Sequence, residues 1–342
     1  MSYKSLVTEG YELAEASQQA YIDISMSAYR EAKKEIDDLL AKTYAKLSGV
    51  EPVNYWAELT KYKRYETLSE EISKAYKAAS KAAGKATRAG LETAMSENYS
   101  RQLFLDSWLA PGVGAVPIDP YLLKYSVTGN ISVWNEISKT AKSKLFPMSF
   151  YTPQAGTLTQ LLTKSYTSEL DKMLQTVQNG FITGKSYTNQ AKVIKEIIGT
   201  YMKADDAATG AMYNALRIAR TEGQRVLNAG ALQAAKEVEN QGFDVEKEWL
   251  ATLDLRTRSS HKSLDGKRKP LDQNFKAPNG AYGPAPGQMS TAGENIHCRC
   301  TTMTIIDGEG PEFRRGRNPE TGENEVISFQ SYKEWAKEKG IV

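Results

Sequence analysis

The chain has 342 residues, 40% hydrophobic and 25% charged, which is the composition of an ordinary globular protein of about two domains. A formal net charge of +3 excludes the strong overall basic charge of many nucleic-acid-binding proteins, and two cysteines exclude a disulfide framework. No run approaches the ~18 apolar residues of a membrane helix, so we expect no membrane contact. Residues 1–4 lack the pattern of a signal peptide, so we expect synthesis in a reducing cytoplasm.

Two long helices are predicted at the start of the chain. Residues 5–47 place small, aromatic and aliphatic residues at steps of three and four with no proline, which predicts one helix of up to ~60 Å. Gly49 and Pro52 then break the pattern, which resumes from Tyr55. The short connection predicts a long antiparallel helical hairpin over residues 1–100.

Two features of this hairpin suit contacts with other surfaces. The chain has 19 Tyr against 8 Phe, and a tyrosine ring with its polar tip suits either a half-buried helix seam or a partner. Cationic residues also follow one flank of the second helix at helical spacing. That stripe is typical of a solvated face, and a groove that meets DNA or an acidic partner is the alternative. Its members are Lys74, Lys77, Lys81, Lys85 and Arg88.

The rest of the chain predicts helices followed by a few short strands. Apolar spacing predicts helices over residues 157–180 and 207–240, and Ser186 is a candidate N-cap of a helix that ends at Ile198. Strands are predicted over residues 245–253 and 296–306, with a hairpin around residues 264–272. The fold class is therefore mostly α, with a helical middle and a small C-terminal α+β unit whose short β-strands lie near residues 245–306.

Breaks in composition divide the chain into four predicted regions. Pro and Gly cluster after the hairpin and mark a loop-rich helical connector, and the chain turns polar after Gly308. Residues 309–342 are predicted to form a polar tail with one short helix. The regions are the hairpin at 1–100, the connector at 101–156, a third region at 157–308 and the tail at 309–342.

Both cysteines and both histidines lie in one stretch, which is a candidate metal site. Thiolate and imidazole are good zinc ligands, so Cys298, Cys300 and His261 form the obvious set. In a strand, residues 298 and 300 share a face and His297 points the other way, which favours His261 as the third ligand. The fourth would be Asp254, Asp265 or water. A connection of roughly thirty residues between the candidate ligands is unusual unless its ends are anchored, which also favours a metal.

Two other interpretations of the cysteines remain open. Paired zinc ligands usually have two to four residues between them, and this pair has one, so both thiols could be small buried core residues. In a flat strand their Cα atoms would lie ~6.7 Å apart, near the upper limit for a disulfide. A disulfide is therefore the least favourable of the three.

A structural polar network is predicted beside the metal site. Arg220 and Glu222 interrupt a helix that otherwise faces the core, and Arg256 and Arg258 follow a strand. A buried glutamate needs a partner, which Arg256 or Arg258 would provide through bidentate pairing. An active site with Glu222 as acid or base beside His261 is the alternative. The sequence has neither a nucleophile–base pair nor a complete phosphate-binding loop, so no catalytic residue is assigned.

The same stretch resembles a known family. The pattern Asp-x-Arg-Thr-Arg-x-x-His-x-x-Leu-Asp-Gly over residues 254–266, followed by Asn-x-x-Cys-x-Cys over residues 295–300, is similar to the signature of the phage Mu protein F-like minor capsid, or head morphogenesis, proteins. The preceding Ala-Arg-Thr-Glu at residues 219–222 and Asn228 also resemble that family. The resemblance covers residues 160–305.

The resemblance implies a role in assembly of a tailed-phage head. Such proteins bind the portal and scaffold, enter the procapsid in few copies and can leave with the DNA. We therefore expect a minor capsid protein made in the host cytoplasm and located inside the virion head. Its partners would be portal, capsid or scaffold proteins, with the N-terminal hairpin as the contact, and packaged DNA would be a further partner.

Two alternative functions remain open. Domains of this family also occur fused to toxin enzymes, so a zinc-stabilised nuclease or a toxin-related domain acting on nucleic acid is the alternative. A structural scaffold binder without zinc is the third reading. We expect no enzymatic activity, because the residues after Asp307 are too few to bury the core of an added toxin domain.

Overall fold

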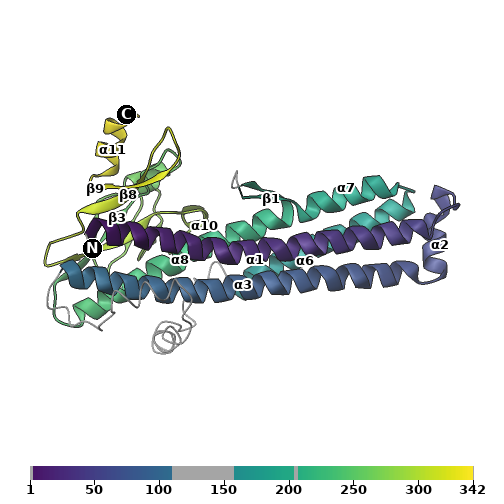
Figure 1. The fold of residues 1–342 in the computed structure, drawn as a ribbon, viewed down its shortest axis with the longest axis horizontal. Helices are drawn as coiled ribbons and strands as arrows, with labels where there is room; N and C mark the ends of the chain where they lie inside the picture. Colours follow the sequence, from purple (N-terminus) through teal and green to yellow (C-terminus); the bar gives the residue numbers. More distant parts are fainter. Residues whose placement is uncertain (1–2, 110–157, 204–206, 342) are drawn as a thin grey trace. The chain divides into compact units, whose positions relative to one another are not determined.

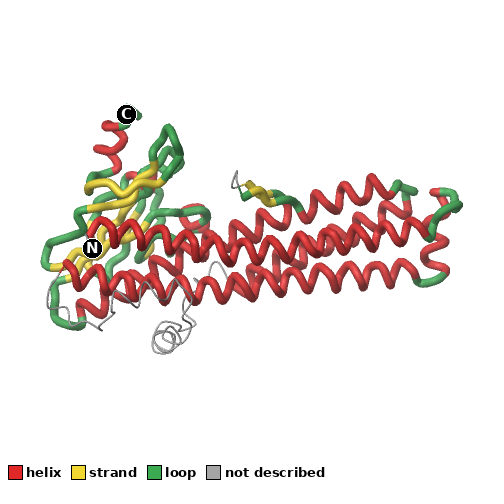
Figure 2. The backbone as a smooth tube through the Cα atoms, in the orientation of Figure 1, coloured by secondary structure: helices red, strands yellow, loops and turns green. Residues whose placement is uncertain are grey.

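The computed structural model describes residues 3–109, 158–203 and 207–341, and its helices and short strands are shown in Figure 1 and Figure 2. The chain divides into two compact units. Unit 1 contains residues 1–18, 90–155 and 220–342, and unit 2 contains residues 19–89 and 156–219. Among the described residues, no helix combines the length and apolar character needed to cross a bilayer. The predicted fold class, mostly helical with a small α+β region near the C-terminus, is confirmed.

The predicted N-terminal hairpin is present. Its two long helices are separated by a turn and a short helix, and the elements are α1 (Tyr3–Ala45), η1 (Pro52–Asn54), α2 (Tyr55–Lys61) and α3 (Arg64–Leu109). The predicted connector at 101–156 begins inside α3, and its residues from 110 onward lie outside the described residues. Each long helix contributes residues to both units.

Side-chain contacts within unit 2 give the direction of the hairpin. Ser25 Oγ on α1 donates to the carbonyl oxygen of Ala83 on α3 at 3.3 Å, and the ring centroids of Tyr29 and Tyr76 lie 5.9 Å apart. Because the residue number rises along α1 as it falls along α3, the two helices are antiparallel. The weak seam of small residues allows this close packing, and tyrosine rings fill the wider gaps.

Unit 2 is completed by helices from the middle of the chain. Helices α6 (Leu158–Ile182) and α7 (Tyr187–Ile198) pack on each other and on α1, where the rings of Tyr44 and Phe181 lie 5.1 Å apart. The predicted N-cap is confirmed, since Ser186 Oγ accepts from the backbone N–H of Asn189. Strands β1 (Tyr201–Met202) and β2 (Ala207–Ala208) precede α8 (Gly210–Glu239), whose first residues also belong to unit 2.

A buried carboxyl group joins three helices of unit 2. Glu169 on α6 is 6% exposed and accepts hydrogen bonds from Tyr76 on α3, from Asn214 on α8 at 2.7 Å and from Ser165 at 2.8 Å. Burial and the nearby carboxylate raise the pKa of Tyr76, so its hydroxyl stays a donor. With three donors around it, the buried carboxylate is well satisfied.

Unit 1 is built on a three-stranded antiparallel sheet. Strand β3 (Val245–Leu250) lies between β4 (Arg268–Pro270) and β7 (Thr301–Ile306), and the pairing of Trp249 with Thr302 is typical of its register. Helix α8 contributes Ala235 and Val238 to a core cluster that also contains Val245 and Ile306. Both predicted strands are therefore present, and both are shorter than expected.

The long connection between β4 and β7 contains structure of its own. It contains β5 (Phe275–Lys276), β6 (Tyr282–Gly283) and α10 (Ala292–Asn295). Phe275 is fully buried against Trp249, with ring centroids 5.2 Å apart. The connection of roughly thirty residues noted in the sequence therefore contains short elements, and Phe275 packs it against the sheet.

The residues after 308 form part of the fold, so the expectation of a polar tail is wrong. A hairpin of β8 (Phe313–Arg317) and β9 (Asn324–Ser328) is followed by α11 (Tyr332–Glu338), which is the short helix that the sequence predicts. Trp335 on α11 is fully buried in the same core cluster as Trp249 and the two cysteines.

A hydrogen bond from α11 gives a first testable prediction. The Tyr332 hydroxyl donates to the backbone carbonyl of Asp254 at 2.8 Å in a buried position. Tyr332→Phe leaves that carbonyl without this donor, so we expect urea denaturation to show a loss of ~1–2 kcal/mol in the free energy of unfolding. Tyr282→Phe is the control, because Tyr282 is exposed, and it should leave stability unchanged. Equal stability of the two variants would contradict the prediction.

A buried carboxyl group on α3 makes the stability of unit 1 dependent on pH. Asp106 is 0% exposed, and Gln102 Nε2 donates to its Oδ1 at 2.7 Å. Burial raises the pKa of Asp106 from 3.8 to about 7, against the opposing hydrogen bonds of Gln102 and Thr304. The group is therefore largely protonated in the folded chain at mildly acidic pH.

The second prediction follows from that pKa. Because the folded pKa is raised above the unfolded one, the protonated group stabilises the fold below about pH 4, and this stability is lost as the pH rises towards 7. We expect Asp106→Asn to flatten the profile of unfolding free energy over this range, by up to ~1.4 kcal/mol per pH unit. Urea denaturation at several pH values measures the slope. Glu71→Gln, on an exposed carboxylate of α3, should keep the wild-type profile, and an unchanged slope in Asp106→Asn would refute the prediction.

Candidate metal centre

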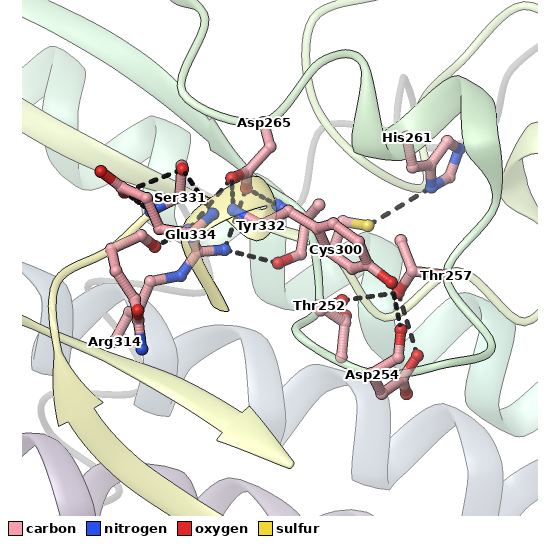
Figure 3. Close-up of polar contacts among 12 residues, drawn as sticks. Thr252, Asp254, Thr257, His261, Asp265, Cys300, Arg314, Ser331, Tyr332 and Glu334 are labelled. Atoms are coloured by element: carbon pink, nitrogen blue, oxygen red, sulfur yellow. Dashed lines mark hydrogen bonds and ion pairs between the residues drawn. The ribbon is translucent and has the colours of Figure 1, made fainter. Parts of the chain in front are cut away.

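The structure brings three predicted ligands together in the core of unit 1. His261 Nδ1 lies 3.3 Å from Cys300 Sγ (Figure 3) and 3.7 Å from Cys298 Sγ, and the three ligand atoms lie within 4.8 Å of one another. All three residues are buried, and both cysteines are free thiols, so no disulfide joins them. Such a cluster of one imidazole and two thiols has the chemistry of a zinc-binding set.

Local turns place these side chains. His261 lies on the one-turn helix α9 (Ser259–Lys262), and the backbone N–H of Leu264 donates to its carbonyl. The cysteines precede β7 rather than lying in it, which corrects the prediction of a strand from residue 296. His297 has a φ of 55°, so the backbone turns immediately before Cys298 instead of continuing a strand from residue 296.

The ring of His261 is oriented by a buried carboxylate. Its Nε2 lies 2.6 Å from Glu294 Oε2, while Glu294 accepts from Ser260 Oγ at 2.9 Å and Asn279 Nδ2 at 2.6 Å. Burial opposes ionisation of Glu294, but these hydrogen bonds and the His261 ring outweigh it and hold the pKa of the carboxyl below its usual value. A proton on Nε2 facing Glu294 leaves the Nδ1 lone pair directed at the sulfurs, as in many zinc sites.

The two thiols ionise unequally. The hydrogen bond from Cys298 lowers the pKa of Cys300 against burial, with help from His261, whereas the same hydrogen bond together with burial raises the pKa of Cys298. Cys300 is therefore the first to become a thiolate. A bound divalent cation would displace the remaining proton, because thiolates are the metal-binding form.

The predicted fourth ligand lies elsewhere. The Asp254 carboxylate pairs with Arg299 and accepts from the Arg256 backbone N–H at 2.9 Å and from Thr257 Oγ1 at 3.0 Å, so it closes a turn and is not a member of the cluster. Asp265, the other carboxylate considered, pairs with Arg314. Three protein side chains therefore converge, and the fourth position on a bound ion would be left to water or another small ligand.

The predicted polar network is present in a different form. Glu222 on α8 lies 3.2 Å from Arg225, one turn away, so its partner is Arg225 rather than Arg256 or Arg258. Burial raises the pKa of Glu222, and Arg225 partly offsets this effect. Arg258 instead donates to the carbonyl oxygen of Ile296 and fastens α9 to the turn before the cysteines. Arg220 on α8 is only half-buried.

The strongest tie between α8 and the cysteine segment comes from Asn228. Its Nδ2 donates to the carbonyl oxygens of Pro286 and Cys300, both at 3.1 Å, and its Oδ1 accepts from the Thr302 backbone N–H at 3.1 Å. Gln224 Nε2 also donates to the Cys300 carbonyl at 2.9 Å. The sequence indicates Asn228 only through the family resemblance, and local spacing predicts none of these contacts, because the partners lie 58 to 76 residues away.

Part of the chain, including the candidate centre, matches a known family model. Residues 171–303, which include the whole candidate centre, match the family described as phage Mu protein F like protein. The chain contains a phage Mu protein F-like region. The resemblance read from the motifs at residues 254–266 and 295–300 is therefore confirmed.

The matches to two known proteins extend beyond residues 171–303. The minor head protein GP7 of Bacillus phage SPP1 is 29% identical over 307 residues, which cover 90% of this chain and 88% of GP7. The NAD(+)–arginine ADP-ribosyltransferase EFV of Enterococcus faecalis is 36% identical over 188 residues, which cover 54% of this chain but only 35% of that protein. No solved structure gives a significant match.

Proposed function

We propose that the chain is a minor head protein that acts in head morphogenesis of a tailed phage and has no catalytic activity of its own. The similarity to GP7 carries this proposal, because it runs through nearly the whole of both chains and so includes the helical hairpin as well as the Mu F-like region. The proposed location is the interior of the virion head, in few copies. Quantitative mass spectrometry of purified virions tests this, and absence of the chain from filled heads would refute it.

The proposed partner is the portal, and the proposed contact is one face of α3. The cationic residues that follow this face at helical spacing are all exposed, and alanines lie between them, so an acidic surface could approach closely. They are Lys74, Lys77, Lys81, Lys85 and Arg88. The competing interpretation is that this face is only solvated. Charge reversal distinguishes the two interpretations, because it should weaken binding to the portal only if the face is the contact.

The test uses substitutions, because a truncation would damage the fold. Residues 3–18 and 90–109 belong to unit 1, so removal of residues 1–100 would unfold the Mu F-like part as well. We expect Lys77→Glu with Lys85→Glu to abolish co-purification with the portal. Lys34→Glu with Lys42→Glu is the matched control, since both lysines are exposed on α1 at the same spacing. Equal recovery of portal by both variants would reject this contact.

We further propose that the candidate centre binds zinc and that the ion is structural. The donor set fits, since two thiols and an imidazole Nδ1 converge and Glu294 fixes the imidazole orientation. His261, Cys298 and Cys300 would hold the ion and join α9 to the start of β7. The zinc would supply folding stability rather than a reaction.

An enzymatic role is the second candidate, and the likeness to EFV is the observation that favours it. That likeness covers about a third of EFV, so it carries no activity to this chain by itself. The fully buried His261 also speaks against direct contact with a nucleic acid. Incubation with NAD⁺ and an arginine-containing acceptor tests for the activity named for EFV, and incubation with DNA and RNA in Mg²⁺ tests for a nuclease. Transfer of ADP-ribose to the acceptor, or cleavage that disappears in His261→Ala, would overturn the non-catalytic proposal.

A further inference from the structure

Unit 1 contains a cavity that neither the metal centre nor the proposed portal contact uses. Its volume is about 300 Å³, which is at the lower end of the range for small-molecule sites. Its walls come from α1, α3, α8, β7, β8 and the segment after β3. Every lining residue belongs to unit 1, so the cavity is a property of that unit alone.

The lining carries more positive than negative charge. Both carboxylates of the lining are already paired, Asp254 with Arg299 and Glu15 with Arg315. Arg314 pairs with Asp265, which is not part of the lining. Among the described residues, no carboxylate lies within ion-pairing distance of Arg101 or Arg317, although Glu97 acts on Arg101 from farther away. The arginines of the lining are Arg101, Arg299, Arg314, Arg315 and Arg317.

Arg101 is the least satisfied of these groups. Its NH1 donates to Asn98 Oδ1 at 3.1 Å, but its buried Nε has no hydrogen-bond partner among the described residues. A guanidinium has five N–H donors, and a buried one without acceptors is costly. The free donors therefore point to an acceptor from outside the described residues.

The backbone makes room for this side chain. Gly10 on α1 faces Arg101, and a Cβ atom at that position would lie 2.6 Å from Arg101 Cδ. The glycine thus lets a long cationic side chain lie between α1 and α3, in place of the small apolar residues that fill the seam elsewhere. Placement of a charge at such a close helix contact is hard to explain by packing alone.

Part of the lining is apolar. Leu227 on α8, Leu250 at the end of β3 and Met303 on β7 contribute to it. A cavity lined by both guanidinium groups and aliphatic side chains suits a ligand with an anionic end and an apolar body. A bare inorganic ion would leave the aliphatic part of the lining without a contact.

We propose that this cavity binds an organic phosphate, with its phosphate group at Arg101 and Arg317 and its apolar part against Leu227 and Met303. The planar guanidinium fork matches the geometry of phosphate oxygens, and such charge-assisted hydrogen bonds are roughly twice as strong as neutral ones. A cavity of this volume holds a body no larger than about a mononucleotide. This site is independent of the proposed role in head assembly and of the zinc.

Isothermal titration calorimetry of the full chain with AMP, phenyl phosphate and inorganic phosphate tests the proposal. We expect saturable binding of an organic phosphate at one site per chain, and binding about tenfold or more weaker in Arg101→Gln. Arg217→Gln is the matched control, because Arg217 is a half-buried arginine outside the cavity and in the other unit, and it should bind as the wild type does.

Three results would overturn the proposal. The first is no heat of binding for either organic phosphate at millimolar concentration. The second is inorganic phosphate binding as tightly as the organic probes, which would mean that the aliphatic lining takes no part. The third is undiminished binding in Arg101→Gln. If Arg101→Gln does not fold, Arg317→Gln is compared with the wild type instead, because Arg317 is half-buried and also lines the cavity.

Discussion

The Cys300→Ser variant is expected to be purified without zinc and to unfold at a much lower temperature than the wild-type chain. Wild-type protein prepared without chelator should contain one zinc per chain by inductively coupled plasma mass spectrometry. Structural zinc contributes ~10–16 kcal/mol of apparent free energy in small metal-binding domains, so its loss should dominate any packing change at a buried thiol. His261→Ala should behave in the same way, and a chelator should lower the melting temperature of the wild type.

His297→Asn is the matched control for these variants. His297 is exposed and has a φ of 55°, a conformation that asparagine tolerates well, so both zinc content and melting temperature should be kept. Wild-type protein that contains no metal and does not respond to chelator would contradict the prediction. Cys298 and Cys300 would then be ordinary core thiols, and His261 would be a buried histidine held by Glu294.

The Asp265→Asn variant is expected to lose ~3–5 kcal/mol of unfolding free energy, the usual cost of leaving a buried charge unpaired. The Asp265 carboxylate accepts from Arg314 at 2.9 Å and from the backbone N–H groups of Ala251 and Tyr332 at 2.7 and 2.6 Å (Figure 3). Arg314 donates in turn to the Ala251 carbonyl. This clamp joins β8 and α11 to the end of β3, so its loss should release the C-terminal segment.

A double-mutant cycle separates the charge effect from packing. Asp265→Asn, Arg314→Met and the double variant are compared by urea denaturation, and we expect the double variant to be more stable than the sum of the single losses predicts. Lys247 offers a comparison with Arg314, because it is also a buried cation but has no carboxylate partner among the described ion pairs. Its Nζ donates to the Leu271 carbonyl at 2.8 Å. Additive losses would show that Asp265 and Arg314 act separately and would refute the clamp.

Periodicity predicted the helical part of this fold well. The break at Gly49 and Pro52 located the turn of the hairpin, and the Ser186 N-cap was found from its residue type alone. These features depend on neighbours in sequence, through backbone conformation and the repeat of the helix. The residues that gather at the centre were also found, because cysteine and histidine are rare in this chain and their chemistry is distinctive.

Long-range partners could not be predicted from local pattern. Arg314 stands in a basic run that resembles a solvated tail, yet it is 2% exposed because Asp265 lies opposite it. Asp254 was expected on the metal, but Arg299 and its own turn occupy its carboxylate. His297 adopts a positive φ that moves the cysteines out of the expected strand. In each case the deciding contact lies in a segment whose position is fixed only by the finished fold.

The division of α1, α3 and α8 between the two units has a consequence for synthesis on the ribosome. Unit 2 uses no residue after 219, so all its parts have been translated while much of the chain is still to come. Unit 1 needs residues 3–18 together with residues up to 341, and so it cannot close until residue 341 has been translated. Lys4 and Tyr11 leave the ribosome long before their partners Phe313 and Arg315 are made, so these contacts form only after the whole of unit 2 has been translated.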